Sequence, residues 1–274
     1  MRYINYIYKL EIMKNLFTII LFFVGFQVSD VEKESAFQEG EWFKFEMSYS
    51  GLVKAGNATL SLKETKLDGK PVYHVVGKGW TTGAIKWMFK VKDRYESYFD
   101  KETGVPYKFI RKIDEGGHTK DIEIKFDHEN RKAEVFNKKH KNVKTIATEK
   151  DVQDMVSMYY HLRNSIDIAS LKEGDEIKTN MFFDEENYGF KLKYLGKETI
   201  EVDINGSEVK VKTIKFRPYV MAGRVFKEEE SLTLWVSADK NKMPLKIKAD
   251  LAVGSLRADL VAFKGLKHPF QIEF

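Results

Sequence analysis

Apolar and polar side chains alternate along most of the chain. In the stretch WFKFEMSYS, residues 42–50, Phe43, Phe45, Met47 and Tyr49 alternate with lysine, glutamate and serine. A period of two is typical of a β-strand that buries one face and exposes the other. We therefore predict many such strands, and the alternation returns at residues 58–62, 72–76, 107–109, 122–126, 177–183, 190–194, 200–204, 232–236, 245–251 and 256–262.

Short polar segments rich in Gly, Asn and Asp separate these stretches. They include LDGKP, DEGGH, DHEN, INGSE and ADKNKMP, and the pair Asn205-Gly206 predicts a type I′ hairpin turn. Short turns favour antiparallel neighbours, and so many strands rarely form a flat open sheet. The sequence therefore predicts an all-β fold, a large antiparallel meander rolled into a barrel or half-barrel. Because no linker or repeat divides it, we predict a single β-rich domain over residues 29–274.

One stretch, DVQDMVSMYYHLRNS at residues 151–165, has the period of an α-helix instead. We expect Asp151 to be its N-cap, with Asp154 as a second carboxylate in the first turn. Arg163 interrupts the apolar face, so it is expected to pair with a carboxylate or with carbonyls of the sheet. This amphipathic helix is predicted to pack on or across the rolled sheet. Its apolar face comprises Val152, Met155, Val156, Tyr159 and Leu162, and its polar face Gln153, Asp154, Ser157, Tyr160, His161 and Asn164.

The N-terminal residues 1–28 have the features of a signal peptide. Lys14 precedes an apolar run from Leu16 to Phe26, which is shorter than the roughly 20 residues that a membrane span needs. Met13 fits the true start better than Met1, because the preceding segment is not a usual n-region. We therefore expect export to the periplasm, and an uncleaved anchor in the inner membrane is the alternative. The chain has no cysteine, which excludes disulfides, thiolate metal sites and thiol nucleophiles.

The charge pattern and the histidines indicate neither a nucleic-acid surface nor a metal site. The formal net charge is +5, and Lys and Glu are interleaved along the strands, which is typical of a solvated outer sheet face. The six histidines are scattered without metal-ligand spacing, and the segment GKGWTTG lacks the spacing of a phosphate-binding loop. We expect no cofactor and no nucleic-acid partner.

Candidate chemistry is sparse. Asp154, Ser157 and His161 follow helical spacing, but side chains from one straight helix form a ladder along it and not a catalytic triad. A glycosidase would need two carboxylates facing a cleft, and no pair can be chosen among 41 acidic residues. Between Gly79 and Phe99 the chain concentrates aromatic side chains, which suit either a core or the wall of a sugar or lipid site.

Several stretches together resemble a known family. They are GEWFKFEMSYSGLVKAGNATL, TTGAIKWMFKVKDRYESYFD, VPYKFIRKIDEGG, VQDMVSMYYHLRN and LTLWVSADKNKMPLKIKADLAVGSLRADL. In this order, over nearly all of residues 40–262, they resemble the exported bacterial family known as domain of unknown function 3108, whose members are similar to YmcC-like β-barrel proteins. The resemblance implies a rolled antiparallel meander in the Gram-negative envelope, and it implies no catalytic residues.

Together these observations lead to a functional hypothesis without catalysis. We expect an exported periplasmic protein that binds or carries an amphipathic envelope molecule, either a lipid or a lipid-linked glycan. The alternatives are a polysaccharide-active enzyme of the periplasm and a structural assembly factor that binds another envelope protein. The candidate ligand-binding residues are Trp80, Trp87, Asp93, Tyr95, Asp154, Ser157, Tyr160, His161 and Arg163.

Overall fold

A computed structural model describes residues 34–221 and 232–273, with the side chains of 220 and 221 left out. The predicted signal peptide, residues 1–28, lies outside this range. Eight strands form the first half of the described chain: β1 (Trp42–Tyr49), β2 (Val53–Leu67), β3 (Lys70–Thr81), β4 (Lys92–Asp100), β5 (Pro106–Glu115), β6 (His118–Asp127), β7 (Lys132–Asn137) and β8 (Asn142–Ala147). Six follow: β9 (Glu176–Phe183), β10 (Glu186–Ile204), β11 (Ser207–Met221), β12 (Leu232–Ser237), β13 (Pro244–Asp250) and β14 (Ser255–Lys264).

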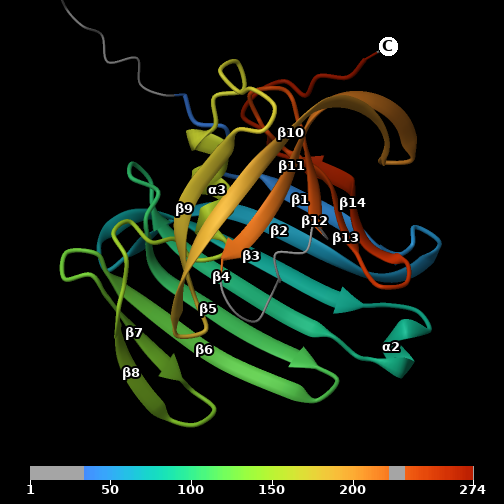
Figure 1. Ribbon diagram of the computed structural model, residues 1–274. Coiled ribbons are helices and arrows are strands. Elements are labelled where there is room, and N and C mark those ends of the chain that lie inside the picture. Colours follow the sequence, from blue (N-terminus) through green and yellow to red (C-terminus); the bar gives the residue numbers. More distant parts are fainter. Residues whose placement is uncertain (1–33, 222–231, 274) are drawn as a thin grey trace, which may run out of the picture. The chain divides into compact units, whose positions relative to one another are not determined.

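All of these strands belong to one antiparallel sheet (Figure 1). Apart from β8 and β9, strands that are neighbours in sequence pair with each other, and β1 pairs in addition with β14, so the order runs from β8 through β1 and β14 to β9. The predicted meander is confirmed. The Asn205-Gly206 turn joins β10 to β11 with φ values of 56° and 79°, as a type I′ turn requires. The sheet is open, because its two edges, β8 and β9, do not pair with each other.

The segment between the two edge strands bridges the opening. Gln153 N donates to Asn180 O (2.9 Å), and Phe182 N donates to Gln153 O (2.8 Å), which extends the sheet beyond β9 by one parallel bridge. Near β8, the Asn187 side chain donates to Ala147 O over 2.8 Å. These bonds hold the start of the helical segment against β9 and tie the β9–β10 hairpin to β8.

Two helices are described, and both differ from the expectation. A short helix, α2 (Ile85–Met88), lies in the β3–β4 connection, where no helix was predicted. The predicted helix, α3, spans only Ser157–Ser165. Asp151 is not its N-cap, because Asp151 has a left-handed φ of 51° and precedes the first turn. Asp154 takes that role: its Oδ1 accepts from the backbone N–H groups of Val156 (2.7 Å) and Ser157 (2.8 Å).

The two predicted faces of α3 do not divide into a buried and an exposed side. Asp154, Ser157 and Tyr160 of that face are buried, whereas Met155 of the predicted apolar face is exposed. The helical segment lies between the two halves of the sheet (Figure 1), and residues 36 and 37 pack beside it in the same apolar cluster. That cluster also takes in buried side chains of β2 to β7 and β9, among them Leu62, Val75, Phe99, Phe109, Ile124, Val135 and Phe182. Polar residues of a helix enclosed on both sides need internal partners.

Candidate functional site

A cleft of about 740 Å³ lies beside α2, and we call it the α2 cleft. The end of β3, the loop that carries α2, the start of β4 and the end of β5 form its walls. It lies where the predicted aromatic segment turns from one strand to the next. Its lining residues are Lys78, Gly79, Trp80, Thr81, Lys86, Lys90, Val91, Lys92, Asp93, Arg94, Lys112, Ile113 and Asp114.

Specific contacts shape the loop over this cleft. Thr81 Oγ1 accepts from Val91 N (2.9 Å), which closes the base of the loop. Phe89 packs against Gly116 of the β5–β6 turn, where a Cβ atom would stand 2.5 Å from the Phe89 ring. Gly116 also has a φ of 60°, so a glycine suits this position in two ways. The loop is therefore held at both ends, while Trp87 between them is 92% exposed.

The cleft is strongly basic. Six of its lining residues are Lys or Arg and two are Asp, and the ladder register places Lys78, Arg94 and Lys112 side by side across three strands. Arg94 bonds Glu96 (2.6 Å), and Lys112 lies 3.5 Å from Asp121. The other four bases, Lys78, Lys86, Lys90 and Lys92, have no carboxylate partner within the described part of the chain. Unpaired ammonium groups around a partly apolar hollow favour an anionic ligand.

Asp93 stands beside a second carboxylate. Burial, together with the neighbouring Glu115, raises the pKa of Asp93 to about 6. Arg111 lies near both Asp93 and Tyr95. It forms an ion pair with Asp184, whose carboxylate also accepts a hydrogen bond from Lys120 Nζ at 2.8 Å. Asp93 can therefore change its charge between pH 5 and 7, which alters the net charge of the cleft.

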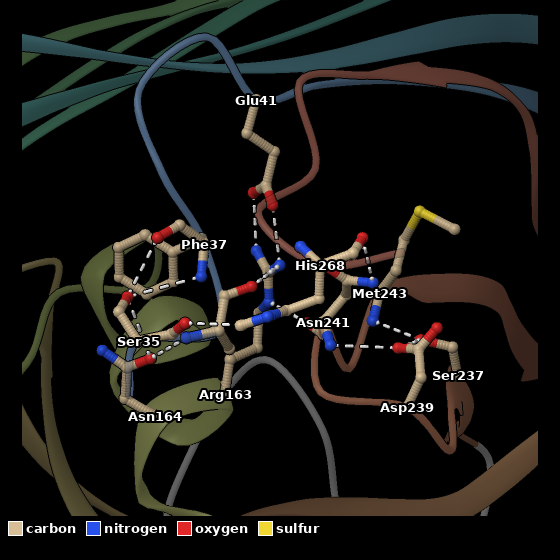
Figure 2. Close-up of polar contacts among 11 residues, drawn as sticks. Ser35, Phe37, Glu41, Arg163, Asn164, Ser237, Asp239, Asn241, Met243 and His268 are labelled. Atoms are coloured by element: carbon tan, nitrogen blue, oxygen red, sulfur yellow. Dashed lines mark hydrogen bonds and ion pairs between the residues drawn. The ribbon is translucent and has the colours of Figure 1, made fainter. Parts of the chain in front are cut away.

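Arg163 lies in a different, closed site (Figure 2). Its guanidinium donates to both carboxylate oxygens of Glu41 (2.6 and 2.7 Å), to Ala36 O (3.1 Å) and to Asn241 O (2.9 Å). Glu41 and Arg163 are both buried. The predicted pairing of Arg163 with a carboxylate is thus confirmed, and Glu41 immediately precedes β1.

Further hydrogen bonds extend this cluster to the C-terminal segment (Figure 2). Asn241 Oδ1 accepts from His268 N (3.0 Å), the His268 ring lies 2.9 Å from Ser35 O, and Asn164 Oδ1 accepts from Ala36 N (2.8 Å). Every donor nitrogen of Arg163 has a partner and the site is closed to solvent. We conclude that this cluster joins four distant parts of the chain and serves structure.

Asp154, Ser157 and His161 do not form a triad. Ser157 Oγ accepts from Asp154 N (3.0 Å), and Asp154 Oδ2 accepts from the buried Ser97 hydroxyl (2.6 Å). His161 lies near Ser165, one turn further along the helix. Burial raises the pKa of Asp154 to about 6. The hydrogen bonds of Asp154 and Ser157 cap the helix, which leaves them no geometry for nucleophilic catalysis.

The structure thus separates the sequence candidates into two places. Trp80 and Asp93 line the α2 cleft, Trp87 lies on the loop above it, and Tyr95 is next to Arg111. The helical candidates Asp154, Ser157, Tyr160 and Arg163 belong to the interior, and His161 lies on the same helix with its ring near Ser165.

Sequence reasoning missed the bases of the cleft. In sequence Lys78 stands between two glycines, whereas Arg94 and Lys112 have acidic residues close by, so the three bases form no basic run. Only the pairing register of β3, β4 and β5 brings them together. The signal that could have found them is the run of lysines at positions 86, 90 and 92, which has no acid between its members.

The fold places the protein in the class of β-barrel-like meanders. A solved β-barrel-like protein of domain of unknown function DUF1849 from Brucella abortus is similar over 85% of this chain and 100% of its own, with a TM-score of 0.52 and 10% identity. The chain belongs to the family described as Protein of unknown function (DUF3108), whose family model matches residues 44–261. No curated protein matches the sequence.

Two further solved structures are more distant. One is described as an exported protein with a YmcC-like fold from Bacteroides fragilis (TM-score 0.33, 7% identity, 83% of this chain and 97% of that one). The other is described as a lipoprotein from Parabacteroides distasonis (TM-score 0.33, 9% identity, 84% and 98%). Within the described residues, no helix combines the length and the apolar character that a membrane crossing requires.

Proposed function

We propose that this protein binds or carries an anionic amphipathic molecule of the bacterial envelope, a lipid or a lipid-linked glycan, in the α2 cleft. The observation that carries the proposal is the combination of Trp80 with six basic side chains around a hollow of about 740 Å³. Small-molecule sites are commonly about 300–1,000 Å³ in volume and combine an apolar wall with a few placed polar groups. The role is binding and not catalysis.

The chemistry of the lining defines the ligand class. Trp80, Val91 and Ile113 offer apolar surface to an acyl or prenyl chain, and the lysines around them offer point charges to a phosphate or carboxylate. A neutral glycan would leave these charges unused. The space around α3 is filled by the chain's own side chains, so we assign the ligand to the α2 cleft.

The periplasm is the compartment that this proposal assigns. It is supported by the apolar run from Leu16 to Phe26 after a basic residue. The envelope contains anionic amphipathic molecules in abundance, which fits the ligand class.

Two measurements test the proposal. The first is mass spectrometry of an organic extract of protein purified without detergent from the envelope of its host, beside a matched control protein. The second is titration with the soluble short-chain lipid dihexanoylphosphatidylglycerol, followed by calorimetry. We expect near-stoichiometric recovery of one lipid or glycolipid in the first, and saturable binding in the second.

Variants of the cleft make the titration specific. Trp80→Leu should abolish measurable binding, and the double variant Lys78→Gln/Lys112→Gln should weaken it by about tenfold. Lys63→Gln/Lys66→Gln on β2 removes the same charge from exposed positions outside the cleft and should bind like the natural protein. Equal binding by all variants would refute the site. Release of new reducing ends from a polysaccharide would point to an enzyme instead, and stoichiometric recovery of one outer-membrane protein would point to an assembly factor.

A further inference from the structure

Exposed apolar side chains gather at one end of the sheet. Of the twelve large hydrophobic residues that are exposed within the described chain, nine lie in four segments at or beside strand connections: 50–54, 82–92, 138–144 and 251–257. Four of them are almost bare, with exposed fractions of 92% for Trp87, 87% for Leu52, 83% for Met88 and 77% for Val253. The other five are Val53, Phe89, Val143, Leu251 and Leu256.

The same four segments are basic throughout. They contain nine Lys or Arg residues and neither Asp nor Glu: Lys54, Lys86, Lys90, Lys92, Lys138, Lys139, Lys141, Lys144 and Arg257. Subtracting these nine charges from the whole-chain value of +5 leaves the rest of the sequence at −4. The positive charge of this protein is therefore concentrated where its exposed apolar side chains are.

The strand topology brings these segments to one end, which we call the turn rim. They join β1 to β2, β3 to β4, β7 to β8 and β13 to β14, and in an antiparallel meander such alternate connections share one end (Figure 1). Three of them adjoin directly. Tyr49 OH donates to Val253 O (2.7 Å), Ser50 N donates to Ser255 O (2.7 Å), and Thr82 N donates to Ala55 O (3.1 Å).

Among the other connections at this end that the structure describes, the β9–β10 turn is acidic, and its charges are already paired; the β11–β12 connection, residues 222–231, lies outside the described residues. Asp184 and Glu185 form the β9–β10 turn. Arg111 and Lys120 hold Asp184, and Lys144 bonds Glu185 at 2.5 Å. These contacts pull the acidic turn into the molecule's own network, so that it does not oppose an anionic surface.

We infer that the turn rim docks on an anionic lipid bilayer. A tryptophan and aliphatic side chains with lysines between them match the interface of a bilayer, where apolar groups enter and ammonium groups stay with the headgroups. Because the bases accompany the exposed apolar side chains in all four segments, an anionic bilayer fits the rim better than a protein partner does. The inference goes beyond ligand binding in the α2 cleft, because three of the four segments lie outside that cleft.

Single labelled cysteines test this inference cleanly, because the chain has none of its own. Leu52→Cys and Val253→Cys, each carrying the polarity-sensitive dye NBD on the full chain, report on the rim. Glu129→Cys, in the exposed β6–β7 turn at the opposite end, is the control. The vesicles are phosphatidylethanolamine and phosphatidylglycerol at a ratio of three to one, and pure phosphatidylcholine vesicles are the neutral comparison.

We expect both rim labels to shift to the blue with the anionic vesicles and to be quenched by nitroxide groups on the acyl chains. The Glu129→Cys label should do neither. Removing the charges in Lys139→Gln/Lys141→Gln should lower the vesicle partition coefficient by about tenfold or more, since each base near an anionic surface contributes roughly fivefold. Lys63→Gln/Lys66→Gln should leave it unchanged.

Three results would overturn the inference. Rim labels that do not respond to anionic vesicles would exclude insertion. An equal response to phosphatidylcholine, or an equal response at Glu129→Cys, would show that the N-terminal apolar run alone holds the chain on the vesicle. A blue shift that grows with protein concentration in the absence of vesicles would assign the rim to self-association. None of these variants changes Trp80. Ligand binding in the α2 cleft and docking of the turn rim on a bilayer can therefore be refuted independently of each other.

Discussion

Replacing Arg163 by methionine should be among the most damaging single changes in this protein. Arg163 and Glu41 are almost wholly buried, and the guanidinium donates to the carboxylate and to two backbone carbonyls. Methionine has a similar length but no donor, so Arg163→Met leaves Glu41 as an uncompensated buried charge. Removal of one member of a buried pair costs about 3–5 kcal/mol. For a domain of this size that corresponds to a loss of about 10 °C in melting temperature.

The partner substitution should cost less, and the structure gives the reason. In Glu41→Gln, the arginine keeps both carbonyl acceptors and one amide oxygen. Four aromatic rings, those of Phe37, Phe43, Tyr159 and Tyr160, also lie 5.2–5.6 Å from the guanidinium carbon and attract its positive charge. We expect a loss of about 2 kcal/mol, roughly half of that for Arg163→Met.

Urea unfolding, followed by circular dichroism, measures both variants and the double variant. The double variant should lose less stability than the two single variants lose together. Each single change leaves one buried charge without its partner, whereas the double variant removes both charges. Lys54→Met, which removes an exposed ion pair with Glu46, is the control and should cost less than about 1 kcal/mol. A loss below 1 kcal/mol for Arg163→Met, or a larger loss for Glu41→Gln, would refute the reasoning.

Three further predictions concern Asp154, the cleft and the α2 loop. Asp154 has a pKa of about 6 in the folded protein against 3.8 in the unfolded chain, so folding favours its protonated form. Its contribution to the free energy of unfolding is therefore fully present below pH 4 and declines by about 3 kcal/mol as the pH rises through 6. Asp154→Asn should remove that part of the decline in urea titrations at pH 4.5, 5.5 and 7. Protonation of Asp93 makes the cleft more positive, so calorimetry should show tighter binding of dihexanoylphosphatidylglycerol at pH 5 than at pH 7, and Asp93→Asn should abolish the difference. Gly116→Ala should destabilise the protein more than Gly83→Ala. Both glycines have a positive φ, but only at Gly116 would a Cβ press against Phe89. Thermal unfolding compares the two variants, and equal losses in melting temperature would contradict this packing.

The fold was predictable because its information is local. Alternation along Phe43, Phe45 and Met47 depends only on neighbouring residues, and so does the Asn205-Gly206 turn. The environment of the helix was not local: Arg163 meets Glu41, 122 positions away, and Asn241, 78 positions away. A polar residue on a helix looks the same in sequence whether it faces water or a buried partner.

The candidate site was partly predictable for a related reason. The aromatic concentration from Gly79 to Phe99 marked the connection that forms the α2 cleft, and Trp80 lines it. Its bases come from three strands, and only the register between those strands aligns Lys78 with Arg94 and Arg94 with Lys112. Period-two alternation predicts that a strand exists, but it does not determine which residue of the neighbouring strand pairs with a given position.

The pairing of β1 with β14 has a consequence for the order in which the molecule assembles. The other ladders of the described sheet join strands that are consecutive in sequence, whereas Trp42 of β1 pairs with Lys264 of β14. Nearest-neighbour hairpins close short loops and form early, but this ladder must close a loop of more than two hundred residues. The two half-sheets can therefore fold as the chain emerges, but they cannot join until the last strand has been synthesised and, in an exported chain, has crossed the membrane. Until then β1 carries a free edge, and a chain truncated before Ser255 keeps that edge permanently.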